Sequence, residues 1–359
     1  MRSGMIDIHK YRHQIKSRTM THYRSTNATK SAVSFALKRV VQAPYWFLIS
    51  LLLIGPTTAR AAWPEKPIRI VVPFVPGGAA DSAARLMAPS LQKRLGQPVV
   101  IENRAGAGAT IGTSAVATSL PDGYTLLLGS ASNAISNAIQ SKLPYVFERD
   151  LVPVMLVAEI PGVVVVPSKL PVKNIQELIA YAQAHQGDIS YGSPGYGTSV
   201  HLAGELFQSM TGTSMVHVPY KGASAAMTDL LGMRLQLMFP ALAAAQPHIQ
   251  AGNLRALAVT TRKRSVIAPD LPTVHEAGLA GYEVGGWIGF FVPKGLAPEV
   301  MTALQRAIED TMKDEEMRRA FFKLGIEPTP ASAHVLREKV ESDTRRWEQV
   351  IKNRKMDLQ

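Results

Sequence analysis

Short runs of β-branched and other apolar residues alternate with helix-like stretches along most of the chain. Runs at 68–72, 99–102, 125–128 and 163–166 are each bounded by proline, glycine or polar turn residues. Strands that alternate with helices in this way predict parallel β-sheets covered by helices. We therefore expect an α/β protein, and the return of the pattern after residue 163 suggests two similar lobes.

The segment before residue 62 has the composition of a cleavable export signal. Lys38 and Arg39 precede the uncharged stretch 40–59, and Ala59-Arg60-Ala61 supplies the small residues that a signal peptidase needs. A membrane anchor is the alternative, but the most apolar part is well short of the ~20 residues that a transmembrane helix needs. We expect residues 1–61 to be a signal peptide and the mature protein to be periplasmic.

The net charge depends on whether that segment is counted. The whole chain carries a net charge of +12, but residues 1–61 hold ten Lys and Arg against one Asp. The remainder keeps 29 of the 39 basic residues and 26 of the 27 acidic ones, a net charge of +3. Nucleic acid is therefore not an expected partner, because binding it needs a strongly basic surface.

The chain has no cysteine. This composition excludes disulfides, thiolate metal sites and cysteine nucleophiles. The part after residue 61 has the length of one large domain or two medium ones, so its core is large enough to fold without cross-links.

Two glycine-rich loops are the most informative features for function. The loop 74–78 follows the strand predicted at 68–72, and the loop 193–198 precedes a helix predicted at 199–210. Glycine lets the backbone approach a ligand and offer N–H donors, and a helix N-terminus carries a partial positive charge. Each loop is thus a candidate anion site, although turn geometry alone would also explain it. Facing each other, the loops could hold both ends of a dicarboxylate or one carboxylate from two sides.

Asp81 closely follows the first loop and has two interpretations. As a helix cap, a role that Ser82 could also fill, it would start a helix that runs to about Leu95 and ends at Gly96. As a free carboxylate beside the loop, it would be a candidate catalytic acid. Its position just after the turn that ends the strand favours the capping role.

Further polar candidates follow other predicted strands. Ser130, Ser132 and Asn133 follow the strand at 125–128, and Tyr220 follows a later strand. Ligands of α/β proteins bind at the carboxyl ends of strands, so these four residues are candidate ligand contacts. Packing is the alternative for Tyr220.

The sequence offers no persuasive catalytic or metal-binding set. The loop 74–78 lacks the third glycine of a dinucleotide fingerprint, and no P-loop motif occurs. Ser193 has no G-x-S-x-G context, and for His201 we identify no zinc-site partner at the i+4 spacing. We therefore expect a binding protein without metal or cofactor and not an enzyme.

With these residues in view, the chain resembles the Bug family, the extracytoplasmic solute receptors of tripartite tricarboxylate transporters. The resemblance covers nearly all of the chain after residue 62. Each of its motifs is weak alone, but their occurrence in this order is specific. The matching segments are Trp63-Pro64-Glu65-Lys66-Pro67-Ile68, Pro73-Phe74-Val75-Pro76-Gly77-Gly78 with Asp81, Glu102-Asn103-Arg104-Ala105-Gly106-Ala107-Gly108, Pro121-Asp122-Gly123-Tyr124-Thr125, Tyr191-Gly192-Ser193-Pro194-Gly195-Tyr196-Gly197-Thr198 with His201, Val218-Pro219-Tyr220-Lys221-Gly222, Leu271-Pro272-Thr273, Glu276-Ala277-Gly278 and Arg346-Trp347.

This resemblance implies a two-lobed periplasmic binding protein of the Venus-flytrap type, type II-like, with two α/β lobes joined by two crossing strands. The crossings are expected near Pro161-Gly162 and Gly286-Trp287. The first lobe would then be discontinuous, with residues 62–162 and 287–359, and the second lobe would comprise residues 163–286.

The resemblance also implies that a ligand carboxylate is held between the two glycine loops. With the candidates above, the predicted ligand-binding residues are Phe74, Pro76, Gly77, Gly78, Asp81, Ser130, Ser132, Asn133, Ser193, Gly195, Gly197, Thr198, His201 and Tyr220. We expect no metal and no cofactor at this site, and a monomeric protein.

Three functions remain open at this level. The leading one is capture of a small organic carboxylate and its delivery to a tripartite tricarboxylate-type membrane permease. A second is ligand sensing for a histidine-kinase partner, and a third is a secreted enzyme that uses Asp81 or His201. The sequence leaves the identity of the carboxylate open.

Overall fold

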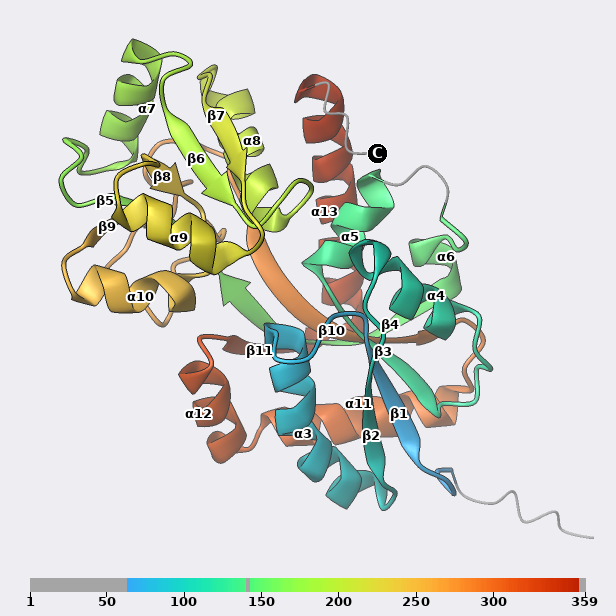
Figure 1. Cartoon of the computed structure of the whole chain (residues 1–359). Helices are drawn as coiled ribbons and strands as arrows, with labels where there is room; N and C mark the ends of the chain where they lie inside the picture. The colour runs from blue at the N-terminus through green and yellow to red at the C-terminus, as the bar shows by residue number, and fades with distance from the viewer. Residues whose placement is uncertain (1–62, 140–142, 355–359) are drawn as a thin grey trace, which may run out of the picture. The chain divides into compact units, whose positions relative to one another are not determined.

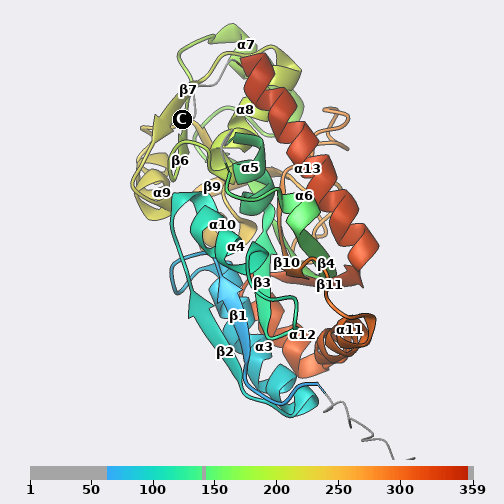
Figure 2. The same cartoon turned by 90° about the vertical axis from the view of Figure 1, so that its right-hand side faces the viewer.

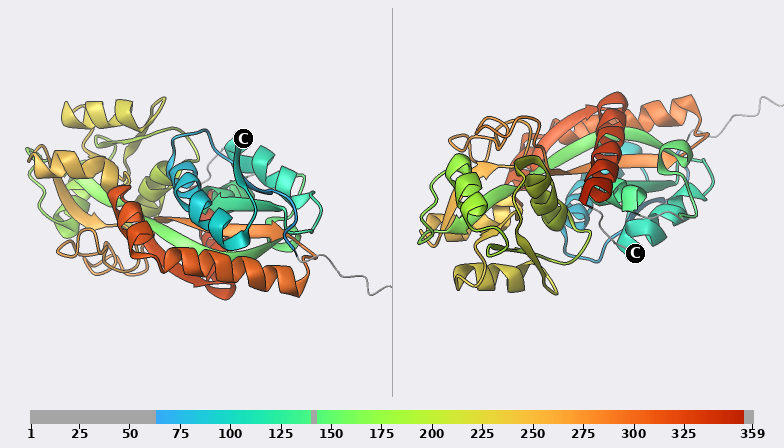
Figure 3. Two further views of the ribbon diagram at one scale, coloured as in Figure 1. Left: turned by 90° about the horizontal axis from the view of Figure 1, so that it is seen from below. Right: turned by 90° about the horizontal axis from the view of Figure 1, so that it is seen from above.

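The computed structural model describes residues 63–139 and 143–354 (Figures 1, 2 and 3). The predicted signal peptide, residues 1–61, lies outside these residues. In the described ranges, no helix combines the length and the apolar character needed to cross a membrane. The described residues all belong to one compact unit of the chain.

The first sheet has six strands in the order β11-β4-β10-β3-β1-β2. The apolar run 68–72 becomes an inner strand of this sheet, because four of its five residues are buried and helices cover both faces. The six strands are β1 (Ile68–Val72), β2 (Val99–Asn103), β3 (Thr125–Ser130), β4 (Leu151–Pro161), β10 (Gly285–Pro293) and β11 (Glu327–Ser332).

The second sheet has five strands in the order β7-β6-β8-β5-β9. All five residues of the run 163–167 are buried, as expected for a strand covered on both faces. The five strands are β5 (Val163–Pro167), β6 (Ser190–Ser193), β7 (Val216–Pro219), β8 (Leu237–Met238) and β9 (Leu254–Val259).

Both sheets are mixed, so the expectation of parallel sheets is only partly correct. β1 pairs in parallel with β2 and β3, and β6 pairs in parallel with β7 and β8. By contrast, β10 is antiparallel to β3 and β4, and β5 is antiparallel to β8 and β9. The reason is that the chain passes from one sheet to the other and back. The strands β5 and β10, which follow the two crossings, therefore run in the direction opposite to their neighbours in the sheet.

Helices cover both faces of each sheet. In the first lobe, α3, α11 and α12 pack on one face, and α4, α5 and α13 pack on the other (Figures 1 and 2). In the second lobe, α9 and α10 lie on one face and α7 and α8 on the other. The helices are α3 (Ala79–Leu95), η1 (Ala107–Ala109), α4 (Thr110–Ala117), α5 (Ala131–Ile139), α6 (Phe147–Asp150), α7 (Ile175–Ala184), α8 (Ser199–Thr211), α9 (Ala223–Leu231), α10 (Leu242–Gln250), α11 (Pro298–Met312), α12 (Glu315–Lys323) and α13 (Ala333–Arg354).

The two lobes are joined by strands β4 and β10, which pair antiparallel along their whole length. β4 ends at Pro161 and β5 of the other sheet begins at Val163, so only Gly162 separates the two lobes there. The return passage occurs where β10 begins, at Gly285. This arrangement confirms the predicted α/β fold with two lobes.

Helix α13 packs against both lobes (Figure 2). Its first half places Leu336 and Val340 in the core of the first lobe, and its second half places Trp347 and Val350 in the core of the second. The residue boundaries expected for the two lobes therefore stay a prediction, because this helix belongs to both cores.

Candidate ligand-binding site

A cavity of 670 Å³ lies between the two glycine loops, and we call it the outer cavity. The first loop contributes Phe74 and the second loop contributes Gly197 and Thr198. Ser132 of α5 and Ser199 of α8 also line it, so both lobes and two helix N-termini face the same space.

A second cavity of 160 Å³ lies beside the crossing strands, and we call it the inner cavity. It is lined by Ser130 at the end of β3 and by Trp287 of β10. The two cavities share Ser132, Ser199 and Val200 in their walls, so they adjoin at the N-termini of α5 and α8. We call this shared region the junction.

The first loop is held from behind by the Asp81 carboxylate. This side chain, only 3% exposed, accepts hydrogen bonds from the Gly77 backbone N–H at 2.9 Å, from Arg85 Nε at 3.0 Å and from Asn103 Nδ2 at 2.9 Å. Asn103 Nδ2 also donates to the Phe74 carbonyl at 3.1 Å. Burial opposes ionisation of Asp81, but the hydrogen bonds from Arg85, Gly77 and Asn103 outweigh it and lower its pKa.

The expected helix cap was misassigned by a few residues. α3 begins at Ala79 with Gly78 as its N-cap, so neither Asp81 nor Ser82 is the capping residue. Asp81 lies in the first turn, where it reaches back to the loop, and its negative charge also suits the helix N-terminus. Gly96 does end the helix in the left-handed conformation, as expected.

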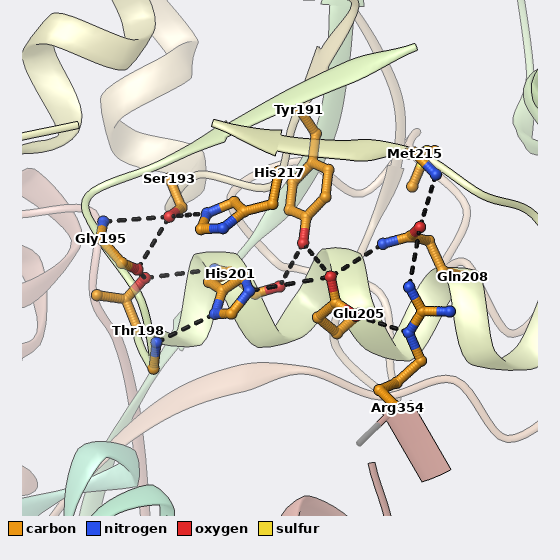
Figure 4. A network of polar contacts seen from close by, with 11 residues as sticks. Tyr191, Ser193, Gly195, Thr198, His201, Glu205, Gln208, Met215, His217 and Arg354 are labelled. Carbon is orange, nitrogen blue, oxygen red and sulfur yellow. Dashed lines mark hydrogen bonds and ion pairs between the residues drawn. The ribbon is translucent and has the colours of Figure 1, made fainter. Parts of the chain in front are cut away.

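The second loop is fixed by its own side chains (Figure 4). Thr198 caps α8: its hydroxyl accepts the His201 N–H at 3.3 Å and donates to the Gly195 carbonyl at 2.8 Å. The Ser193 hydroxyl accepts the Gly195 N–H at 3.1 Å. Gly195 and Gly197 have φ of +134° and +70°, a region where other residues are strained, so the loop needs glycine at both positions.

Two histidines stack behind this loop. The rings of His201 and His217 have centroids 3.8 Å apart, and Ser193 Oγ lies 2.6 Å from His217 Nε2. The Gly197 N–H donates to His201 Nδ1 at 3.0 Å, which leaves the ring hydrogen of neutral His201 on Nε2. Burial lowers the pKa of both rings, that of His217 to about 4, so the pair is uncharged at neutral pH.

A buried carboxylate extends this network to the last turn of α13 (Figure 4). Glu205 accepts hydrogen bonds from the Tyr191 hydroxyl at 2.6 Å, from Gln208 Nε2 at 3.0 Å and from Arg354 Nε at 2.7 Å. Burial disfavours the charged form, but the hydrogen bonds from Tyr191 and Arg354 prevail and lower the pKa of Glu205. The second loop is thus connected through His201 and Glu205 to the last turn of α13.

The sequence analysis overlooked Glu205. It lies four residues after His201 on the same face of α8, and its Oε1 is 3.9 Å from His201 Nε2, so the i+4 spacing did carry a signal. Its contact with Arg354 joins residues 149 positions apart and has no local signal. In the described part of the chain, no group of three or more histidine, cysteine or acidic side chains could hold a metal ion.

The predicted ligand-binding residues fall into two groups. Those that line a cavity are Phe74, Ser130, Ser132, Gly197 and Thr198. The others lie on the loops or behind them and line neither cavity; they are Pro76, Gly77, Gly78, Asp81, Asn133, Ser193, Gly195, His201 and Tyr220.

Two members of the second group support other parts of the wall. The Asn133 side chain is buried, accepts the Ser130 N–H at 2.8 Å and donates to Thr113 at 2.7 Å, so it positions the end of β3. The Tyr220 hydroxyl donates to Asp229 at 2.8 Å.

Among the described residues, the walls of both cavities contain no charged side chain. What they offer an anion is the N-terminal turns of α5 and α8 and the hydroxyls of Ser132 and Ser199. Helix N-termini and hydroxyls can bind a carboxylate without a countercharge. Ser199 was not singled out in the sequence, although its place directly after the capping Thr198 puts it at the same helix end.

Comparison with known proteins places this geometry in a family. A family profile described as "Tripartite tricarboxylate transporter family receptor" matches residues 83–356. Protein BugT of Bordetella pertussis is 38% identical over 308 residues, which cover 85% of this chain and 94% of that protein.

Three solved structures are also similar. The periplasmic binding protein BugD is 35% identical with a TM-score of 0.66, over 81% of this chain and 98% of that one. Rpa4515 of R. palustris, solved with adipate, is 35% identical with a TM-score of 0.68, over 81% and 98% of the two chains. MatC (Rpa3494) of Rhodopseudomonas palustris, solved with bound malate, is 30% identical with a TM-score of 0.67, over 80% and 100% of the two chains.

Proposed function

The chain belongs to the tripartite tricarboxylate transporter receptor family, the Bug-type solute-binding proteins, and from this premise we propose that it captures a small carboxylate between its lobes and delivers it to a membrane permease. In this proposal residues 1–61 are removed on export, and the protein acts in the periplasm without performing chemistry. The first lobe comprises residues 62–162 and 287–359, and the second comprises residues 163–286.

The observation that carries the proposal is the outer cavity between the two glycine loops. Its walls come from both lobes, so a ligand there would contact both and favour their closure. The N-terminal turns of α5 and α8 suit a carboxylate, and two relatives were solved with adipate and malate.

The buried polar groups behind the loops favour binding over catalysis. Asp81 and His201, the two candidates for an enzymatic role, are 3% exposed, and each is occupied by a backbone N–H of its own loop. We propose that Asp81, Ser193 and His201 shape the glycine loops, that Asn133 positions the end of β3, and that Phe74, Ser132, Gly197 and Thr198 face the ligand.

A thermal-shift screen against small carboxylates tests the proposal. The full chain would be expressed in a Gram-negative host, purified from the periplasmic fraction and freed of co-purified ligand by unfolding and refolding. Ligand at one hundred times its Kd should stabilise the folded protein by about 2.7 kcal/mol, a rise in melting temperature of several degrees. The mass of the purified protein shows whether the leader was cleaved after residue 61.

Two results would contradict the proposal. Folded protein whose melting temperature no carboxylate raises would exclude a carboxylate receptor. Conversion of a bound carboxylate to product, lost in D81N or H201N, would assign an enzyme. Loss of uptake of the identified ligand when the gene is deleted would support delivery to a permease.

A further inference from the structure

The inner cavity differs from the outer cavity in its size and in the elements that line it. Both cavities have largely apolar walls, but the inner one is smaller, 160 Å³ against 670 Å³, and its bulkier side chains are apolar. The apolar side chains come from both lobes and from the crossing strands between them: Ile160, Val200, Phe239, Ala241, Val284 and Trp287. A ligand that enters the inner cavity from the junction therefore contacts mostly apolar side chains.

A second negative charge would find no partner in the inner cavity. Two buried ionisable groups behind its walls are already committed: the His201 ring accepts from its own loop, and the Asp343 carboxylate accepts Trp287 Nε1 at 2.8 Å and pairs with Arg346 at 2.8 Å. A carboxylate placed in the inner cavity would lose its hydration and gain no cation, which costs several kcal/mol.

The junction offers donors for one carboxylate. Ser132 and Ser199 lie there on opposite lobes, each in the first turn of its helix. Within the described ranges, neither hydroxyl makes a hydrogen bond to another protein group. Both are therefore available to a ligand, next to two positive helix ends.

We propose that the ligand is a monocarboxylate with a compact apolar body, whose carboxylate lies at the junction, facing the loop residues of the outer cavity, and whose body fills the inner cavity. An apolar space of about 150 Å³ accommodates one benzene ring, and the inner cavity measures 160 Å³. Benzoate-like and cyclohexanecarboxylate-like acids have the matching size and charge. This inference names the substrate class for the proposed function and rests on it.

Titration calorimetry on the same refolded protein tests this substrate class. Benzoate and cyclohexanecarboxylate would be compared with adipate and malate, the ligands of the two relatives. We expect the two monocarboxylates to bind at least about tenfold more tightly than either dicarboxylate, a difference of about 1.4 kcal/mol.

A pair of variants on α10 locates the ligand body. Ala241, the N-cap of α10, lines the inner cavity, whereas Ala251, the C-cap of the same helix, is exposed and lines neither cavity. A241L should fill part of the inner cavity and weaken benzoate binding at least tenfold, and A251L should leave it unchanged. If A241L does not fold, the ligand series on the unmodified protein still decides the question.

The outcomes separate this inference from the proposed function. Tighter binding of adipate or malate than of benzoate would overturn the monocarboxylate assignment and leave the receptor function intact. Unchanged benzoate affinity in folded A241L would overturn the placement of the ligand body. Absence of binding by every carboxylate would overturn the proposed function, and this inference with it.

Discussion

At the scale of single residues, the two glycine loops depend on side chains that line neither cavity. Asp81 and His201 each accept a backbone N–H from a glycine loop, at 2.9 and 3.0 Å. Glycine gives these loops access to a ligand but adds backbone freedom, and the buried acceptors remove that freedom. Asp81 and His201 are thus as necessary to the conformation of the glycine loops as the glycines themselves.

The D81N variant should destabilise the protein and weaken ligand binding together. An amide can no longer accept from Gly77, Arg85 and Asn103 at once, and its NH₂ group would face donors. We expect a loss of about 1–3 kcal/mol in the free energy of unfolding, measured by urea denaturation. D188N, at an exposed aspartate, is the control and should change it by less than about 0.5 kcal/mol. Lost binding with unchanged stability would instead assign Asp81 a direct ligand contact.

Acid should destabilise the fold through the stacked histidines. Their pKa values are lowered in the folded state, that of His217 to about 4, so the unfolded chain takes up protons first as the pH falls below about 6.5. Stability is then highest above pH 6.5 and declines towards pH 4. Between pH 7 and 5, His217 alone should account for about 1–2 kcal/mol of the loss.

Urea unfolding at pH 7 and pH 5 measures this loss. H217N should show a smaller loss than the unmodified protein. H334N, which changes an exposed histidine on α13, should behave like the unmodified protein. An equal loss in H217N would show that other groups cause the acid sensitivity.

At the scale of elements, α13 contributes side chains to the cores of both lobes, as does α5. Its last turn brings Arg354 to Glu205 on α8, and α8 begins at the second glycine loop. The position of the loop is therefore linked to the position of α13 through His201 and the partly buried Glu205–Arg354 ion pair.

The R354A variant tests that link. Glu205 has a side chain only 9% exposed and would be left without its cation, so we expect a loss of roughly 1–3 kcal/mol in the free energy of unfolding. K352A removes an exposed cation from the same turn and should change the free energy by less than about 0.5 kcal/mol. Equal effects of the two substitutions in urea denaturation would exclude a special role for the Arg354–Glu205 pair.

At the scale of the whole described unit, the two lobes meet at the paired strands β4 and β10. Trp287 of β10 is fully buried there and lines the inner cavity. A ligand in this cavity would change the surroundings of its indole ring directly, and lobe closure would change them further.

Ligand binding should therefore change the intrinsic fluorescence of the protein through Trp287. The change should disappear in W287F and persist in W63F, because Trp63 packs against Tyr124 in the first lobe and lines neither cavity. Fluorescence titration with a bound carboxylate measures it. Loss of the change in W63F alone would place the ligand or the motion elsewhere.

The sequence predicted the features that depend on neighbouring residues. Four features could be predicted from the sequence: the strand runs, the glycine loops, the end of α3 at Gly96 and the two-lobed α/β class. They were predictable because β-propensity, turn chemistry and helix termination act over a few residues. The order of the motifs also predicted the family that the comparisons found. The cap assigned to Asp81 was wrong, because its acceptor role depends on Arg85 and Asn103 as well as on chain position.

Only the tertiary structure decided how distant segments combine. The antiparallel entry of β5 and β10, the contact of Glu205 with Arg354 and the apolar inner cavity each join residues far apart in the chain. Strand pairing and cavity walls depend on which surfaces the whole fold brings together, and no short segment encodes that choice. The sequence by itself thus determined the two glycine loops, whereas the packing of two lobes around the crossing strands decided the size and the lining of the cavities beside them.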